Sequence, residues 1–258
     1  MIKGAHPVVR AIVAAAQRIA PTDMAVFISG ERGSGKELLG RVLHAGSRRA
    51  AAAFVRLDCT ELSPERMDGE LFAASVPAFG QVRSTANLLD RARGGTLFLD
   101  ELPAMPLDVQ ERLPALFAGG GDVRIVASSQ RDMAVDLGSE RLSAHLIEYL
   151  APLELCVPAL RQRRSDIPLL IEHFLAVYGD RHGIGPCRMQ TDAMVQLWQY
   201  DWPGNVRELE SLVERIVVLS RGALIGPGDL PPHIAGGRTP LVHRAAPRPP
   251  PPGLRPLF

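Results

Sequence analysis

Residues 24–37, MAVFISGERGSGKE, decide the fold of this chain. The apolar run MAVFIS is short and leads into a glycine-rich turn, after which apolar residues recur at helical spacing at Leu38, Leu39, Val42 and Leu43. The segment therefore predicts a strand, a loop and a helix in that order. Within the loop, the pattern GxxxxGK places two glycines and a lysine directly between the strand and the helix.

This spacing is a strong signal for a phosphate-binding loop. Glycines let backbone N–H groups converge on phosphate oxygens, the helix N-terminus adds partial positive charge, and Lys36 can reach the β and γ phosphates. A glycine turn with a solvated lysine is the alternative, which the flanking strand and helix disfavour. The residues predicted to bind ATP are Gly30, Glu31, Arg32, Gly33, Ser34, Gly35, Lys36 and Glu37.

The metal shell is less well defined by the sequence. The strict motif ends in Ser or Thr, whose hydroxyl binds Mg2+, whereas Glu37 holds that position here. About sixty residues on, GGTLFLDE (94–101) is an apolar strand that ends in two carboxylates. We predict that Asp100 holds Mg2+ through water and that Glu101 polarises the attacking water, so that both are catalytic candidates. Without the phosphate loop, this pair would be interpreted as two solvated acids at a strand end. The phosphate loop favours a role for both in binding and hydrolysing the nucleotide.

The rest of the chain alternates strand-like and helical patterns. Further apolar runs lie at 54–58, 96–100, 123–128 and 153–157, and a helix is expected at 7–20. Strands that alternate with helices predict an α/β fold with a parallel sheet flanked by helices. After Pro158 the patterns are all helical, at 166–178, 191–200 and 205–219. The predicted units are an α/β nucleotide-binding domain (1–160), a small all-helical domain (161–232) and a proline-rich tail (233–258), which we expect to be disordered or polyproline-like and more often inert than a partner site.

Composition excludes several classes of protein. The 258 residues are 46% hydrophobic, enough for a substantial core. The 29 basic and 28 acidic side chains nearly balance, so no overall basic field attracts nucleic acid or an anionic membrane. Cys59, Cys156 and Cys187 lack the spacing of a zinc site or disulfide framework. Without an apolar run of about 20 residues or a signal peptide, we expect a cytoplasmic protein with no membrane partner.

With both nucleotide motifs in place, the chain resembles the AAA+ central domain of sigma-54-dependent transcriptional activators, the bacterial enhancer-binding proteins. The resemblance covers roughly residues 5 to 232 and includes the strings FVRLDCTEL (54–62), GELF (69–72), VPALRQRRSDIPLL (157–170) and, most specifically, DWPGNVRELE (201–210). It implies a P-loop AAA+ fold with a helical lid, ATP and Mg2+ as cofactors, a homo-oligomeric ring, and action on sigma-54 RNA polymerase.

The resemblance also assigns roles to single residues. Arg207 matches the second sensor, which reaches from the lid to the phosphates, and a guanidinium can fork onto phosphate oxygens. Ser129 and Gln130 stand where the first sensor is usually Thr-Asn. Asp58 stands where the family pairs an asparagine with the glutamate matched by Glu101, so that a like charge replaces a neutral amide.

Several family parts are altered. The GAFTGA loop, which contacts sigma-54, matches only as PAFGQV, and the family's hairpin insertion is reduced to AGGGDVRIV (118–126). Ser143 and Tyr149 replace two arginines that enter the neighbouring subunit's site; Arg141, two residues away, is either a substitute or an ordinary surface arginine. Slow hydrolysis and impaired sigma-54 contact are therefore expected. The partner-loop residues are Pro77, Ala78, Phe79, Gly80, Gln81 and Val82.

Three functions remain open on this sequence. The chain is a ring ATPase acting on sigma-54 transcription, or a nucleotide-gated assembly module with little turnover and another partner, or a decayed relative without a ligand. The intact GERGSGKE, LFLDE and WPGNVREL strings disfavour the third. We expect neither a sensing domain before the AAA+ homology nor a helix-turn-helix after it within these 258 residues, so sequence-specific DNA binding by this chain is not expected.

Overall fold

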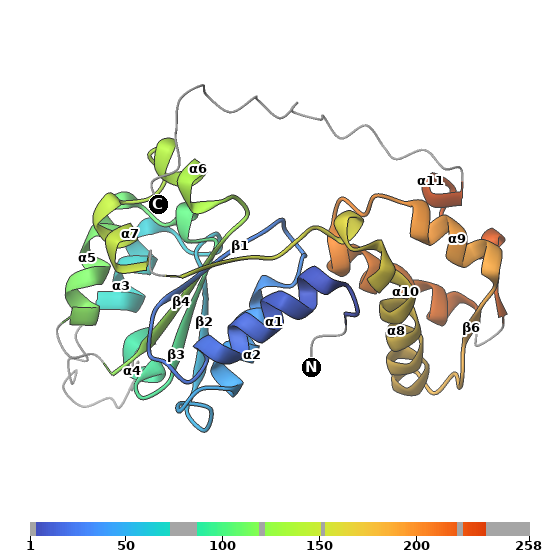
Figure 1. Ribbon diagram of the computed structural model, residues 1–258, viewed down its shortest axis with the longest axis horizontal. Coiled ribbons are helices and arrows are strands. Elements are labelled where there is room, and N and C mark those ends of the chain that lie inside the picture. The colour runs from blue at the N-terminus through green and yellow to red at the C-terminus, as the bar shows by residue number, and fades with distance from the viewer. Residues whose placement is uncertain (1–3, 73–86, 119–121, 151–152, 221–223, 236–258) are drawn as a thin grey trace.

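The computed structural model describes residues 4–72, 87–118, 122–150, 153–220 and 224–235, which form an α/β part and a helical part (Figure 1). The partner loop predicted at 77–82, the glycines at 119–121 and the tail beyond Ala235 lie outside the described residues. No helix in the described ranges has the length and apolar content that a membrane span requires.

A five-stranded parallel sheet forms the centre of the α/β part. Its strand order is β2-β3-β4-β1-β5, so all five carboxyl ends, including the end of β1 that continues into the glycine loop, meet at one edge. The predicted α/β fold is confirmed. The strands are β1 (Val26–Ser29), β2 (Phe54–Asp58), β3 (Thr96–Asp100), β4 (Arg124–Ser129) and β5 (Glu154–Cys156).

Helices cover both faces of the sheet because successive strand residues point to opposite sides. Leu97 and Leu99 pack into one core, and Phe98, between them, packs into the other. Figure 1 shows α1 and α2 on the face toward the helical part. The helices are α1 (Pro7–Ile19), α2 (Lys36–Ala45), α3 (Pro64–Phe72), α4 (Leu88–Ala92), η1 (Leu102–Ala104), α5 (Leu107–Ala118), α6 (Met133–Gly138) and α7 (Ala144–Leu150).

A buried arginine at the first residue of β4 joins the sheet to the segment that follows α1. Arg124 is 1% exposed, and its Nη1 donates to the carbonyl of Ala20 at 2.8 Å, just beyond α1. It makes longer bonds to the carbonyls of Ile19 and Met24. These carbonyls lie at the C-terminal end of α1 and just before β1. Arg124 therefore supplies donors to backbone carbonyls that would otherwise lack them.

The helical part has its own core. Trp202 is fully buried, and its Nε1 donates to the carbonyl of Leu197 at 2.8 Å. The all-helical prediction for this part was wrong in one detail: Arg188–Met189 (β6) and Leu224–Ile225 (β7) pair in parallel. Two-residue strands are too short to give a periodic pattern. The helices are η2 (Leu160–Gln162), η3 (Arg164–Asp166), α8 (Ile167–Arg181), α9 (Thr191–Gln199), α10 (Asn205–Ser220), η4 (Pro227–Asp229) and α11 (Pro232–Ala235).

Candidate functional site

The glycine loop follows β1 and ends where α2 begins at Lys36. Gly30, Gly33 and Gly35 all have positive φ, a conformation that glycine adopts without strain. At Gly33 space also demands glycine, because a Cβ would lie 2.3 Å from the carbonyl oxygen of Gly204. The sequence therefore folds here into a tight loop whose backbone bends around the first turn of α2.

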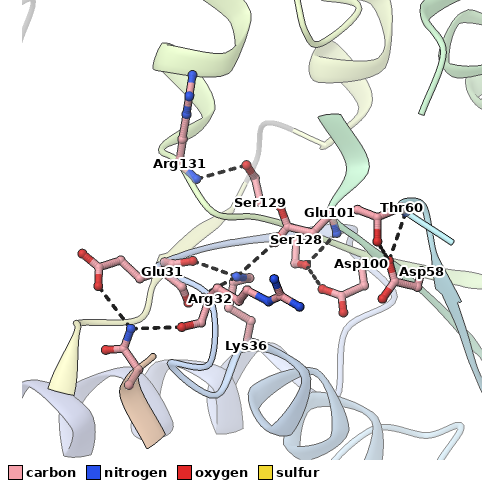
Figure 2. Close-up of polar contacts among 12 residues, drawn as sticks. Glu31, Arg32, Lys36, Asp58, Thr60, Asp100, Glu101, Ser128, Ser129 and Arg131 are labelled. Atoms are coloured by element: carbon pink, nitrogen blue, oxygen red, sulfur yellow. Dashed lines mark hydrogen bonds and ion pairs between the residues drawn. The ribbon is translucent and has the colours of Figure 1, made fainter. Parts of the chain in front are cut away.

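Lys36 connects this loop to the tip of β3. Its Nζ donates to the carbonyl of Gly30 at 2.8 Å and lies 3.2 Å from Glu101 Oε1, while the side chain is 6% exposed. Figure 2 shows Lys36 between the loop and the strand tip that carries Asp100 and Glu101. The predicted loop lysine and the predicted carboxylates are thus within one cluster.

Both oxygens of Asp100 are hydrogen-bonded. Oδ1 accepts from Ser128 Oγ at 2.6 Å, and Oδ2 accepts from Arg56 Nη2 at 2.7 Å. The same Arg56 nitrogen donates to Asp58 Oδ2 at 2.6 Å. Arg56 therefore bridges the ends of β2 and β3, whose registers align Asp58 with Asp100.

Asp58 does not pair with Glu101. Its Oδ1 accepts from the backbone N–H and the hydroxyl of Thr60, at 3.0 and 2.6 Å. Burial acts to raise the pKa of Asp58, but the bonds from Thr60 and from Arg56 outweigh it, so the pKa lies below its usual value. The Arg56 cation thus offsets the extra negative charge that the sequence predicts at this position.

Arg56 is a site residue that was not predicted from the sequence. Alternation in β2 gave a usable signal: Val55 and Leu57 face the core, so Arg56 and Asp58 share the opposite face. Burial acts to lower the pKa of Arg56, and its bonds to Asp100 and Asp58 raise it further than burial lowers it. The guanidinium is therefore firmly charged.

The start of α10 docks directly on the glycine loop. Val206 N and Arg207 N both donate to the carbonyl of Gly33, at 3.0 and 3.4 Å. Asn205 Nδ2 donates to the carbonyl of Arg32 at 3.0 Å and to Glu31 Oε2 at 3.1 Å, and Asn205 Oδ1 accepts from Leu160 N at 2.8 Å. The fully buried Asn205 is a second site residue that was not predicted from the sequence.

Glu31 is held mainly by the helical part. Arg161 donates to both of its carboxylate oxygens, at 2.7 and 2.5 Å. The hydrogen bond from Arg161 lowers the pKa of Glu31, against burial and with help from Asn205. The loop and the helical part are therefore joined on two sides, and the conformation of one depends on the position of the other.

A polar pocket of about 510 Å³ lies between the loop, the strand tips and α10. Its charged lining is balanced, with five cations and five carboxylates. Of the predicted site residues, Arg32, Gly33, Gly35, Lys36, Glu37, Asp100, Glu101, Gln130 and Arg207 line it, whereas Gly30, Glu31, Ser34 and Ser129 do not. The cations are Arg32, Lys36, Arg41, Arg56 and Arg207, and the carboxylates are Glu37, Asp58, Asp100, Glu101 and Glu210.

An apolar pocket of about 220 Å³ adjoins the polar one. The two share Gly35, Leu38, Val206 and Glu210 in their linings. The buried Ser34 Oγ in the apolar pocket has no hydrogen-bond partner among the described residues. A ligand with a charged end and a mostly apolar end matches this pair of pockets. The apolar lining comes mainly from Val9, Ile12, Leu39, Val157 and Phe174.

Ser129 is buried away from the polar pocket. Its hydroxyl is hydrogen-bonded to Asp136 Oδ2 and accepts from Arg131 N at 3.1 Å. Gln130, the next residue, does line the pocket. Of the two residues matched to the first sensor, the structure therefore brings only Gln130 to the polar pocket.

The positions matched to inter-subunit arginines differ from one another. Ser143 is buried, and its N–H donates to Gln110 Oε1 within the same chain at 3.0 Å. Tyr149 is partly exposed. Arg141 has a 44% exposed side chain, with Nη1 3.9 Å from Asp136 Oδ1. Of these three residues, only Arg141 carries a cation.

The acidic side chains of the polar pocket do not fit Mg2+ as they stand. Carboxylate oxygens are suitable donors, yet both oxygens of Asp100 are already bonded and a guanidinium lies against it. Within the described ranges, no three His, Cys, Asp or Glu side chains are grouped so that they could hold a metal ion.

Two family models match the chain. One, described as the Sigma-54 interaction domain, matches residues 2–156, and one described as the AAA+ ATPase lid domain matches residues 161–246. The chain belongs to the sigma-54 interaction domain family. The resemblance inferred from the motifs is thereby confirmed, and the helical part of this family member is its AAA+ lid.

Named relatives agree with this assignment. The chain is 38% identical over 251 residues to the transcriptional regulatory protein ZraR of Escherichia coli K12, covering 92% of this chain and 57% of ZraR. It is 38% identical over 240 residues to the response regulator protein PilR of Pseudomonas aeruginosa, covering 88% of this chain and 54% of PilR. The chain thus spans a little over half the length of these curated relatives.

Solved structures show the same arrangement. NtrX from Brucella abortus in complex with ADP is 33% identical, with a TM-score of 0.81 over 92% of this chain and 56% of that chain. The same protein in complex with ATP gives 33% identity and a TM-score of 0.81, over 90% of this chain and 57% of that chain.

Proposed function

We propose that this chain binds ATP between the glycine loop and the lid and is the nucleotide-responsive part of a sigma-54-type transcriptional regulator with slow hydrolysis. The observation that carries this is the joined pocket pair beside Lys36, polar and lined by charged side chains at one end and apolar at the other. The similarity to NtrX, which was solved with ADP and with ATP, supports the same ligand class.

Binding uses groups that are already in place. The loop amides and the N-terminus of α2 face the phosphates, as in other phosphate loops. Lys36 gives up part of its contact with Glu101 to meet the β and γ phosphates, while Arg207 approaches from the lid. The base occupies the apolar pocket, where Ser34 Oγ offers it a hydrogen bond.

Hydrolysis is slow in this proposal for two reasons. Glu101, the candidate base for the attacking water, is paired with Lys36 at 3.2 Å. Ser143 and Tyr149 supply no cation to a neighbouring subunit's site, and such an arginine is worth about 10³ to 10⁵ in rate in GTPases. Without it, bound ATP persists.

The second candidate function is a nucleotide-gated assembly module that acts on a partner other than sigma-54. The observation that favours it is Ser143, which is buried and bonded within its own chain rather than presented to a neighbour. In both versions the chain forms a homo-oligomeric ring in the cytoplasm. The versions differ in turnover and in the protein that the ring contacts.

The test is steady-state ATP hydrolysis across a protein concentration series, with ATP binding measured on the same samples. We expect binding with slow turnover that does not rise with protein concentration, and no change in Arg141→Ala or in the exposed control Arg66→Ala. Vigorous turnover that rises with concentration, and is lost in both Lys36→Ala and Arg141→Ala, would mean a working ring with a substitute arginine.

Contact with sigma-54 is tested separately by gel filtration of the two proteins with a transition-state analogue of ATP. We expect no stable complex, because the residues matched to the sigma-facing loop read PAFGQV. Co-elution in a complex that requires the analogue would refute the weakened contact and remove the reason for a different partner.

A further inference from the structure

Arg56 is paired with Asp100, the carboxylate matched to the one that holds a divalent cation in P-loop enzymes. Its Nη2 is 2.7 Å from Asp100 Oδ2 and 2.6 Å from Asp58 Oδ2. Its Nε lies 3.4 Å from Glu37 Oε2. One guanidinium thus pairs with three carboxylates of this pocket.

These carboxylates are neutralised without a metal ion. Glu37 Oε1 accepts from Arg41 Nε and Nη2, at 2.9 and 2.7 Å, one turn along α2. Asp100 and Asp58 share Arg56. Since each acid at this end of the pocket has a cationic partner from the chain, Mg2+ gains little by entering, and it would have to displace the guanidinium and its two hydrogen bonds.

Arg56 also retains hydrogen-bonding capacity beyond its contacts with Asp100 and Asp58. Its two strong hydrogen bonds both come from Nη2, and its buried Nε makes no hydrogen bond to the described residues. The side chain lines the same pocket as Lys36 and Arg207. A guanidinium has five N–H groups in a fixed fork that matches phosphate oxygens, so it can keep its carboxylates and still bind an anion.

We propose that Arg56 acts as a tethered cation in place of Mg2+, so that this site binds ADP and ATP without a divalent metal ion. This rests on the proposed nucleotide site and concerns only how its negative charge is balanced. Magnesium-independent binding with slow turnover suits a protein that responds to nucleotide occupancy rather than to each cycle of hydrolysis.

The test compares ADP affinity in excess Mg2+ with affinity in excess EDTA, measured by isothermal titration of the purified chain. For the wild-type chain the dissociation constant should change by less than about threefold on chelation. Arg56→Ser removes the guanidinium and frees Asp100, so its affinity in EDTA should fall about tenfold or more and be largely restored by Mg2+. Circular dichroism checks that the variant is folded.

Arg41→Ser is the matched control. Arg41 lines the same pocket and pairs with Glu37, but its contacts do not reach Asp100. It should lower affinity by the same factor in Mg2+ and in EDTA, leaving the ratio of the two constants unchanged.

A wild-type ratio of about threefold or more overturns the inference, as does an Arg56→Ser variant that binds ADP in EDTA as tightly as the wild-type chain. The wild-type ratio needs no variant, so it decides the matter even if Arg56→Ser does not fold. A chain that binds no nucleotide under either condition refutes the proposed function itself, whereas magnesium-dependent binding refutes only the role of Arg56.

Discussion

Removing the side chain of Asn205 should separate the lid from the glycine loop. Asn205 is fully buried and has φ of 54°, in the left-handed region. Asn205→Gly is the informative change, because glycine keeps this backbone conformation while all side-chain bonds are lost. Asn205→Ala adds backbone strain of about 1 kcal/mol and should be the more destabilised of the two variants.

The expected magnitude follows from the partners that Asn205 leaves behind. Leu160 N loses a buried acceptor at 2.8 Å, and the carbonyl of Arg32 loses a donor at 3.0 Å. Each unsatisfied group costs about 1 to 3 kcal/mol. Glu31 keeps Arg161 and remains partly exposed, so the bond from Asn205 to it adds little. Asn205→Gly should therefore lower the free energy of unfolding by about 2 to 6 kcal/mol.

Urea unfolding followed by circular dichroism measures this change. In a chain of this size the loss corresponds to a fall of about 4 to 24 °C in Tm. Glu31→Gln serves as a control on the same contact, since it keeps the shape of the side chain and removes only the charge. If Asn205→Gly lies within about 0.5 kcal/mol of the wild-type chain, the lid does not dock on the loop through these bonds in solution.

Three further predictions concern the α/β part. His44 is buried with Nδ1 2.9 Å from Thr96 Oγ1, and burial lowers its pKa below the unfolded value of 6.5. Below that pH the unfolded chain binds the extra proton, so stability should fall as pH drops through about 6.5, and His44→Asn should flatten this slope in urea titrations from pH 7 to 5. Burial also raises the pKa of the Cys59 thiol, so Ellman's reagent at pH 8 should modify the exposed Cys156 quickly and Cys59 only after unfolding; fast reaction at Cys59 would contradict its packing. Arg124→Met should lower the free energy of unfolding by about 3 kcal/mol, because it strips donors from buried carbonyls, and a loss below about 1 kcal/mol would show that those bonds are replaced by water.

Local sequence patterns were sufficient to predict the strands of the sheet and the glycine loop. Each of the five strands is an apolar run flanked by loop or helical patterns, and the parallel arrangement follows from the helices between them. The glycine loop also follows from local rules, because Gly30, Gly33 and Gly35 adopt the positive φ that the motif requires. These features depend on neighbours in the sequence, which is why the sequence predicts them.

Local sequence patterns did not predict the contacts between segments that are distant in the sequence. Arg56 meets Asp100 only because β2 lies beside β3 in a register that aligns Asp58 with Asp100. Asn205 meets Arg32 across a separation of 173 residues. Ser129 was assigned to the nucleotide by resemblance, yet its hydroxyl is bonded to Asp136 on α6. In each case the partner of a polar side chain was decided by packing between elements.

The central claim is that nucleotide binds at the glycine loop, and equilibrium titration of ATP onto the wild-type chain and Lys36→Ala tests it most directly. The wild-type chain should bind saturably, and Lys36→Ala should bind about tenfold or more weakly, because a buried cation that meets the phosphates is lost. Arg66→Ala, an exposed cation on α3, should bind as the wild-type chain does. Absence of wild-type binding, or equal affinity in Lys36→Ala, would contradict the account.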